Sequence, residues 1–399
     1  EWVEDAEAGR ALAGAGMVSG AVWSDLDGDG LPELVLACEW GPVRVYGNRG
    51  GRLEEATARW GLERELGWWN GVAAGDLDGD GRMDLVVGNW GRNTGYEEFV
   101  GDELRLYHGD VDGNGTWDLI EGQMDRERKR VMPRRDWKTV GRAISGVVER
   151  FGSYRAYGEA GVEEIYGERL KGMKELRVRT LESRVYLNRG GRFEGRALPM
   201  EAQVAPVFGV CVGDYDGDGK EDVFVSQNFF GTDAETGRYD GGRGLWLRGD
   251  GKGGLAAVGG QESGVRMYGE GRGAALGDYD QDGRVDLVVG QNGGETRLYR
   301  NRRGKAGLRV TLVGAGGNGN GLGAVMRLGA GGEWGPAREV HGGGGYWSQD
   351  SAVSVMAMPF PGDGVLEIRW PGGHKTSTPI PANARRITLH SDGRITELQ

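Results

Sequence analysis

The chain has 399 residues, of which 79 are glycine, and its formal net charge at pH 7 is −11. Glycine is thus nearly three times as frequent as the usual ~7%. No Gly-X-Y period is present, which excludes collagen and favours a loop-rich β protein. The negative net charge argues against nucleic acid as a partner, because that function requires clustered Lys and Arg. We expect no transmembrane segment, because no apolar run is long enough to cross a bilayer.

The first predicted element is an extended segment, Trp2–Ala8. It precedes the first of several repeated hairpins much as Leu53–Ala58 precedes the second. We expect Trp2–Ala8 to supply the fourth strand that the last repeat lacks, and so to join the two ends of a ring. The chain begins with Glu1 rather than Met and shows no signal peptide, so we interpret it as a processed or trimmed product.

Five acidic loops of nine residues follow, and each has the composition of a calcium-binding loop. Oxygen-bearing side chains stand at positions 1, 3 and 5, a Gly at position 6 and a carboxylate at position 9, while the carbonyl of position 7 completes the set. Without a cation, carboxylates crowded in this way repel one another. The predicted ligands are Asp25, Asp27, Asp29, Leu31 and Glu33; Asp76, Asp78, Asp80, Arg82 and Asp84; Asp110, Asp112, Asn114, Thr116 and Asp118; Asp214, Asp216, Asp218, Lys220 and Asp222; and Asp278, Asp280, Asp282, Arg284 and Asp286. Up to five Ca²⁺ are therefore predicted, and their ten positive charges would bring the net charge from −11 to −1.

Short apolar, β-branched runs flank every loop, as in Asp84–Gly88 and Asp286–Gly290. An EF-hand would continue into a helix instead, so each loop is predicted to connect two strands of a hairpin. Three hairpins continue into a third strand, within residues 43–56, 183–197 and 296–304. Four short strands per repeat indicate an all-β fold, a β-propeller of five to seven blades, with the loops on one face of the ring.

The spacing of the loops predicts an insertion. Successive loops begin 51, 34, 104 and 64 residues apart. The interval of 34 places the third loop in the outer hairpin of the second blade, and the interval of 104 contains an inserted segment at about 125–181. Apolar residues recur there with a helical period from Trp137 to Phe151 and again from Tyr154 to Tyr166. A basic stretch from Arg126 to Arg135 precedes these helices and is either a solvated face or a contact for an acidic partner.

Cys38 and Cys211 are the two cysteines, and they lie on predicted strands of different repeats. Both buried free thiols and a disulfide between them are compatible with this placement.

The repeats resemble the FG-GAP family of calcium-binding propeller repeats of the integrin-alpha type, also known as VCBS repeats. The tail resembles the domain that cartilage acidic protein shares with the bacterial UnbV proteins (ASPIC/UnbV), through residues 307–314, 318–328, 338–349 and 366–373. The resemblance implies a propeller at 1–304 with the helical insertion, followed by a small β domain at 305–399. It also implies an extracytoplasmic location, secreted, periplasmic or at the cell surface. Calcium affinities of about 10⁻⁴–10⁻³ M suit that location.

Loops on the opposite face of the ring carry aromatic side chains among amides, a combination that suits sugar rings or peptides. The alternative is that these rings wedge between blades, which we favour for Trp68 and Phe229. The candidate ligand-binding residues are Trp69, Asn70, Asn89, Trp90, Arg92, Asn228, Phe230 and Asn292.

The sequence favours a non-catalytic binding or adhesion module for glycan or protein ligands. The four histidines show no metal-ligand spacing, and no nucleophile elbow or dinucleotide-binding motif is present. One alternative is a propeller hydrolase or lyase acting on polysaccharide, because propellers host such enzymes and fold alone does not decide function. Another is a structural subunit of a surface assembly. The oligomeric state stays open.

Overall fold

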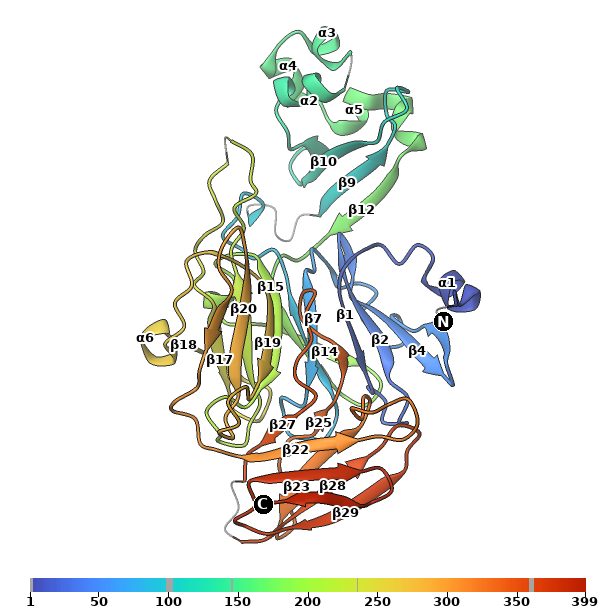
Figure 1. Cartoon of the computed structure of the whole chain (residues 1–399). Helices are drawn as coiled ribbons and strands as arrows, with labels where there is room; N and C mark the ends of the chain where they lie inside the picture. The colour runs from blue at the N-terminus through green and yellow to red at the C-terminus, as the bar shows by residue number, and fades with distance from the viewer. Residues whose placement is uncertain (1–2, 98–102, 145, 235, 359–361) are drawn as a thin grey trace.

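The computed structural model describes residues 3–97, 103–144, 146–234, 236–358 and 362–399. In these residues the chain is mostly β, arranged in several small sheets, none of which closes into a barrel. Figure 1 shows a central group of sheets with a smaller unit at one end and a C-terminal domain at the other.

Four antiparallel sheets form the centre, and we call them blades 1 to 4. Their innermost strands contact one another in the order β1, β7, β15, β19. From the centre outward, the strands are β1 (Met17–Ser24), β2 (Glu33–Glu39), β4 (Arg44–Arg49) and β5 (Arg52–Glu55) in blade 1; β7 (Gly71–Gly75), β8 (Asp84–Gly88), β13 (Arg184–Asn188) and β14 (Phe193–Ala197) in blade 2; β15 (Val207–Gly213), β16 (Asp222–Gln227), β17 (Leu245–Gly249) and β18 (Leu255–Val258) in blade 3; and β19 (Glu270–Gly277), β20 (Asp286–Asn292) and β21 (Arg297–Tyr299) in blade 4. The described residues thus include four such sheets around the centre, and the number of five to seven blades stays a prediction.

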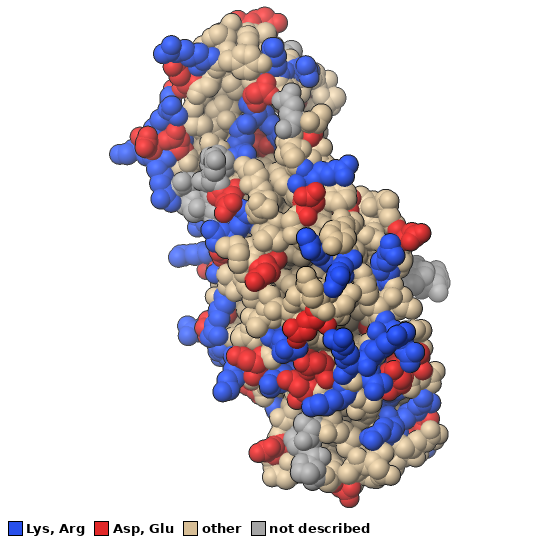
Figure 2. All heavy atoms as spheres, turned by 90° about the vertical axis from the view of Figure 1, so that its left-hand side faces the viewer, with Lys and Arg blue, Asp and Glu red and all other residues tan. Residues whose placement is uncertain are grey.

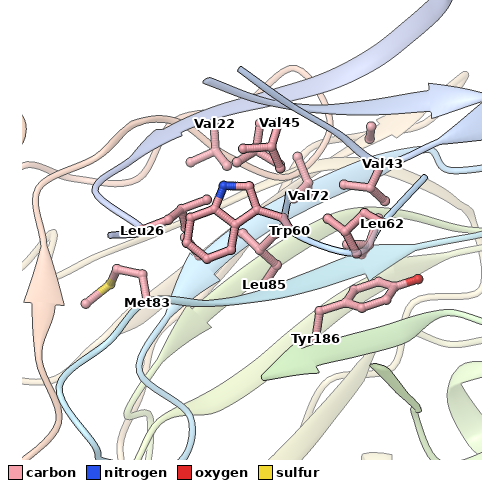
Figure 3. Close-up of a cluster of buried hydrophobic side chains, with 14 of the residues drawn as sticks. Val22, Leu26, Val43, Val45, Trp60, Leu62, Val72, Met83, Leu85 and Tyr186 are labelled. Carbon is pink, nitrogen blue, oxygen red and sulfur yellow. The ribbon is translucent and has the colours of Figure 1, made fainter. Parts of the chain in front are cut away.

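Apolar side chains from facing sheets fill the space between neighbouring blades. Between blades 1 and 2, the indole of Trp60 is 1% exposed and lies among Val22 and Val45 of blade 1 and Leu85 of blade 2 (Figure 3). Phe193 of β14 packs against it at a ring distance of 5.1 Å. Burying a side chain of this size contributes about 1.5–3 kcal/mol or more, so the blades are held by their mutual cores as well as by strand pairing.

A C-terminal segment, rather than the N-terminal one, bridges the first and last blades. Residues 6–12 form a helix, α1 (Ala6–Leu12), which packs on β5, so the prediction that Trp2–Ala8 is a strand closing blade 4 is wrong; Trp2 itself lies outside the described residues. Instead, β26 (Gly342–Gly343) pairs with β1, and the amide of Ser351 donates to the carbonyl of Leu276 in β19 at 2.9 Å.

Between these two contacts, the glycine-rich segment 342–351 crosses the inner strands of the other blades. The amide of Gly345 donates to Val72 O of β7 at 2.7 Å. Gly345 has φ +60°, and a Cβ there would lie 2.8 Å from Val210 O of β15. A side chain would therefore collide with the blade backbone, which explains the run of glycines.

The insertion lies between β8 and β13 and is larger than predicted. It contains its own sheet, in the order β11 (Arg130–Pro133), β10 (Asp118–Asp125), β9 (Leu104–Gly109), β12 (Lys174–Val178). The two predicted helical stretches are four short helices, because the chain turns at glycines between them: α2 (Trp137–Ala143), α3 (Val147–Phe151), α4 (Tyr154–Glu159) and α5 (Val162–Tyr166). Their apolar faces cover one side of the sheet.

The third acidic loop joins β9 to β10 and so belongs to the insertion. Its predicted place in the outer hairpin of blade 2 is therefore wrong.

The C-terminal domain packs two sheets around a shared apolar core. One contains β27 (Ser354–Met356), β22 (Leu308–Val313), β30 (Arg386–His390) and β31 (Ile395–Leu398), with β22 and β30 parallel. The other contains β24 (Glu333–Trp334), β23 (Val325–Ala330), β28 (Gly364–Arg369) and β29 (Lys375–Ile380), and β25 (Arg338–Glu339) also pairs with β23.

Cys38 and Cys211 are free and buried. None of the helices in the described ranges is long and apolar enough to span a bilayer.

Candidate metal loops and binding cleft

The five acidic loops share one hydrogen-bonding pattern. In the second loop, Asp76 Oδ2 accepts from the Gly81 amide at 2.9 Å, and Asp84 Oδ2 accepts from the Leu77 amide at 2.9 Å. The equivalent bonds recur in the other four loops. Each of these bonds engages one oxygen of the carboxylate at position 1 or 9 and so fixes the orientation of that side chain within the loop.

The converging oxygens fit a divalent cation. In each loop, three carboxylate oxygens from different residues lie within 4.8 Å of one another. In the second loop these residues are Asp76, Asp78 and Asp84. Asp76 Oδ1, Asp78 Oδ1 and Asp280 Oδ1 are buried and accept no hydrogen bond in the protein. Buried carboxylate oxygens require a positive partner, and hard oxygen ligands are those that Ca²⁺ and Mg²⁺ prefer.

Burial makes several loop carboxylates costly to ionise, and a bound cation would offset this cost. Burial, with a smaller contribution from the neighbouring Asp78 carboxylate, raises the pKa of Asp84 to about 8. Burial likewise raises the pKa of Asp222 to about 8, of Glu33 to about 7 and of Asp76 to about 6. A bound cation would reverse these shifts by favouring the ionised form.

Four loops lie under the C-terminal domain, and the third lies in the insertion, so the prediction that all five share one face is wrong for the third. Arg369 forms an ion pair with Asp25, and Arg309 Nε lies 2.8 Å from Asp278 Oδ2. The amide of Ala337 donates to Asp76 Oδ2 at 2.7 Å. The C-terminal domain thus contacts the first aspartate of three loops directly.

The same domain reaches the fourth loop through a buried ion pair. Arg338 Nε donates to Glu221 Oε1 at 2.7 Å, and Glu221 stands next to Asp222 at position 9. These four loops therefore connect the strands of their hairpins and also contact the C-terminal domain.

At the other end of the blades, a cleft of about 310 Å³ lies between blades and insertion. Its aromatic wall comes from loops of blades 2 and 3. The half-buried Trp68 stacks on Trp90 at 4.1 Å, and Phe229 lies 4.9 Å from Trp90. Tyr96 and Tyr239 complete this wall. The stacked rings form a rigid apolar surface with part of its area open to solvent.

The opposite wall of the cleft is charged and comes mainly from the insertion. Tyr96 Oη donates to Glu121 Oε1 at 2.8 Å, and Arg135 Nε lies 2.7 Å from Glu121 Oε2. The Arg134 guanidinium lies 4.4 Å from the centre of the Tyr96 ring, and burial lowers the pKa of Arg134. Arg135 also pairs with Asp233 at 3.1 Å. These contacts fix the orientation of the polar groups that face the cleft.

Most of the predicted ligand-binding residues are buried and hold the loops together. Asn89 Oδ1 accepts from the amides of Trp68 and Trp90, and Asn228 Nδ2 donates to two carbonyls. Trp69 and Asn70 are 0% exposed. Trp90, stacked on Trp68, also lines the cleft, although it is 6% exposed. Arg92, Phe230 and Asn292 are less buried, and they pair with Glu182, Arg238 and Glu270 respectively.

The sequence prediction did not select some of the residues that line the cleft. Trp68 and Phe229, assigned there to the space between blades, are the half-buried rings that face it. Arg134 and Arg135 end the basic stretch that the sequence singled out, and this stretch was the available signal. No feature of the sequence pointed to Glu121 or Tyr239 as cleft residues, because the insertion and blade 3 meet only in the folded chain.

Comparison with known proteins supports the repeat assignment. A family model of the FG-GAP-like repeat matches residues 25–87. The chain is 25% identical over 294 residues to cartilage acidic protein 1 of Mus musculus, and 26% identical over 299 residues to cartilage acidic protein 1 of Homo sapiens. These matches cover 70% of this chain and 41% and 40% of the relatives, so the chain spans about two fifths of their length. The resemblance stated from the sequence is confirmed.

Two solved structures of rhamnogalacturonan lyases, the exotype enzyme YesX and YesW, align with 96% of this chain and 75% of their own. Their identities are 10% and 11%, and both TM-scores are 0.19. Superpositions this loose carry no argument about fold or function.

Proposed function

We propose that the protein is a calcium-stabilised, propeller-like binding module that works outside the cytoplasm and holds a short glycan in the cleft beside Trp68. The single observation that carries this proposal is the cleft itself. An open aromatic wall faces charged groups whose orientation is fixed by their own ion pairs. A sugar ring presents an apolar face and a rim of hydroxyls, which such a pair of walls complements.

The size of the cleft limits the ligand. Its volume of about 310 Å³ is at the lower end of the range of about 300–1,000 Å³ for ligand pockets. We therefore expect one or two sugar rings in the cleft, with hydrogen bonds to Glu121, Arg134 and Arg135. Residues of both signs face it, so neutral and acidic glycans both fit its charge.

Calcium is the cation we propose for the five loops. Each loop offers carboxylate oxygens, with a further carbonyl at position 7, and Ca²⁺ takes six to eight oxygen ligands in flexible geometry. The expected weak affinity suits calcium concentrations outside cells, and similarity to cartilage acidic protein 1 supports the same location. We propose a structural role for the ion and no chemistry of its own.

A glycan panel screened in calcium tests the proposal. We expect binding without release of product, and we expect Thr236→Trp, which fills the cleft from its rim, to abolish it while Thr236→Ala retains it. Unchanged binding in Thr236→Trp would place the site elsewhere. Release of shortened saccharides would instead favour the lyase or hydrolase alternative.

A further inference from the structure

Blade 4 begins its outer hairpin as the other blades do but does not complete it. Asn301 Nδ2 donates to the carbonyls of Tyr215 and Val285, as Asn188 Nδ2 of blade 2 donates to those of Leu26 and Met83. The turn that follows is also the same, because the Gly304 amide donates to Asn301 Oδ1 just as the Gly51 amide of blade 1 donates to Asn48 Oδ1. A fourth strand should therefore follow Gly304.

The chain leaves the blade at this point. The Lys305 amide donates to Asp216 O at 3.0 Å, the Gly307 amide donates to Gly283 O at 2.8 Å, and β22 of the C-terminal domain begins at Leu308. Within the described ranges, no strand pairs with the outer edge of β21. That edge keeps backbone groups that can pair with another strand.

A pocket of about 380 Å³ lies where the fourth strand would pack. In blade 2 the fourth strand places Phe193 against the core between blades 1 and 2, and in blade 3 it places Leu255 against the core between blades 2 and 3. Among the described residues, none from a fourth strand of blade 4 packs against the core between blades 3 and 4. Its apolar side chains Trp246, Leu287 and Tyr299 instead line the pocket.

The other blades also show which charge the absent strand should carry. In blades 1 and 2 the arginine after the asparagine, Arg49 or Arg189, pairs with a glutamate of the fourth strand, Glu54 or Glu194, and both N–O distances are 3.0 Å. Each glutamate follows the inward apolar residue of its strand, Leu53 or Phe193.

Blade 3 lacks both members of this ion pair. It has Asp250 at the arginine position and Ala256 at the glutamate position. In blades 1 to 3, which each have a fourth strand, the arginine and the glutamate are thus either both present or both absent.

Blade 4 has only the arginine. Arg302 follows Asn301, is exposed, and is in no ion pair among the described residues. Figure 2 shows Lys and Arg mixed with Asp and Glu over the lower middle of this side of the molecule. Arg300 and Arg248, beside the same pocket, are already paired with acidic residues of the loops.

We propose that the outer edge of β21 binds an extended segment of a partner polypeptide by strand addition. The segment carries an apolar residue followed by glutamate. The apolar side chain enters the pocket over Trp246, the glutamate pairs with Arg302, and the backbone completes blade 4 as a fourth strand. This surface is separate from the glycan cleft, so a negative result for peptide binding would leave the glycan proposal unaffected, and the reverse also holds.

A peptide with the sequence of residues 51–58, the fourth strand of blade 1, is the probe. We expect it to bind the whole chain and to slow amide hydrogen exchange at Arg297–Tyr299. Reversing the charge in Arg302→Glu should weaken binding about three- to fivefold, the factor for an exposed ion pair. The charge-reversed peptide, with Glu54→Lys, should bind the Arg302→Glu variant with the affinity that the unmodified peptide has for the unmodified protein. Arg303→Glu is the matched control, because its equivalents Gly50 and Gly190 have no partner charge.

The pocket is tested by Gln261→Trp, which places a large ring in it from the exposed surface of α6 (Gly260–Ser263). We expect this variant to keep its melting temperature and lose the peptide, while Gln261→Ala keeps both. No binding at millimolar peptide, or protection that appears away from β21, would overturn the proposal. Concentration-dependent dimers abolished by Arg302→Glu would also overturn it, since the occupant would then be a second copy of this chain.

Discussion

Single carboxylates in the loops carry a pH dependence that distinguishes the metal-free protein from the calcium-bound one. Their folded pKa values, about 8 for Asp84 and Asp222, lie above those of an unfolded chain near 3.9. The stability that such a group contributes is present below the unfolded pKa and is lost as the pH rises through the folded pKa. In EGTA, we expect the melting temperature to fall between pH 5 and 8.

Calcium should reverse this trend, because the ion binds the ionised carboxylates. The increase in melting temperature on adding calcium should therefore be larger at pH 8 than at pH 5. Thermal unfolding at several pH values with calcium or EGTA measures both slopes. A calcium effect that shrinks as the pH rises would contradict carboxylate ligation.

Two tryptophans test which side chains hold the blades together. Replacing the buried Trp60 with Ala should lower the free energy of unfolding by about 3–5 kcal/mol, because it removes the ring between blades 1 and 2. Replacing Trp117 with Ala should change it by less than about 0.5 kcal/mol, since that ring is 69% exposed. Denaturant unfolding of both variants measures the difference, and equal losses would refute the assignment of Trp60 to the core.

At this scale, the sequence predicted which acidic side chains lie close together, while the metal ligands and the ligand-binding residues stay predictions. The loop residues are contiguous, so spacing alone brings Asp76, Asp78 and Asp84 together. Asn89 and Asn228 were chosen because amides suit a ligand, yet their side chains bond backbone groups of neighbouring loops. Local sequence does not distinguish an amide that binds a ligand from one that replaces missing backbone pairing in a turn.

At the scale of elements, the second and third acidic loops can be compared, because they share one sequence pattern but lie in different surroundings. The second meets the C-terminal domain through Asp76 and Ala337, and the third lies in the insertion. We expect Asp78→Ala to increase hydrogen exchange in β8 and at the Ala337 junction. Asp112→Ala should increase exchange in β9 and β10 alone. Exchange that spreads over the whole chain in Asp112→Ala would contradict an insertion with its own metal loop and core.

The insertion shows where element prediction succeeds and where it fails. Its helices follow from the apolar period between Trp137 and Tyr166, because periodicity is a local property. Its boundaries were placed at about 125–181, whereas the chain leaves blade 2 after β8 and returns at β13. The strand pairs β9–β10 and β9–β12 look like any other hairpin strands in sequence. Only the pairing of β8 with β13, across this long excursion, shows that they do not belong to a blade.

For the whole molecule, calcium should control how the domains hold together. Each site can add about 2.7 kcal/mol at a calcium concentration of 100 times its Kd. Because four loops lie at the junction, we expect EGTA to lower the melting temperature substantially and to expose the connection at Arg302–Gly307 to protease. Calorimetry and limited proteolysis measure the two effects. An unchanged melt, with the connection still protected, would argue against structural ions at the junction.

The glycine segment that crosses the inner strands has a consequence for how the protein is made. Blades 1 to 4 are synthesised before residues 342–351, so the inner edge of β1 in a growing chain stays uncovered until these residues emerge. Uncovered edges of this kind invite pairing with other chains. Nascent molecules should therefore need protection during translation, and premature termination anywhere ahead of this crossing should yield aggregates instead of a shorter working fragment.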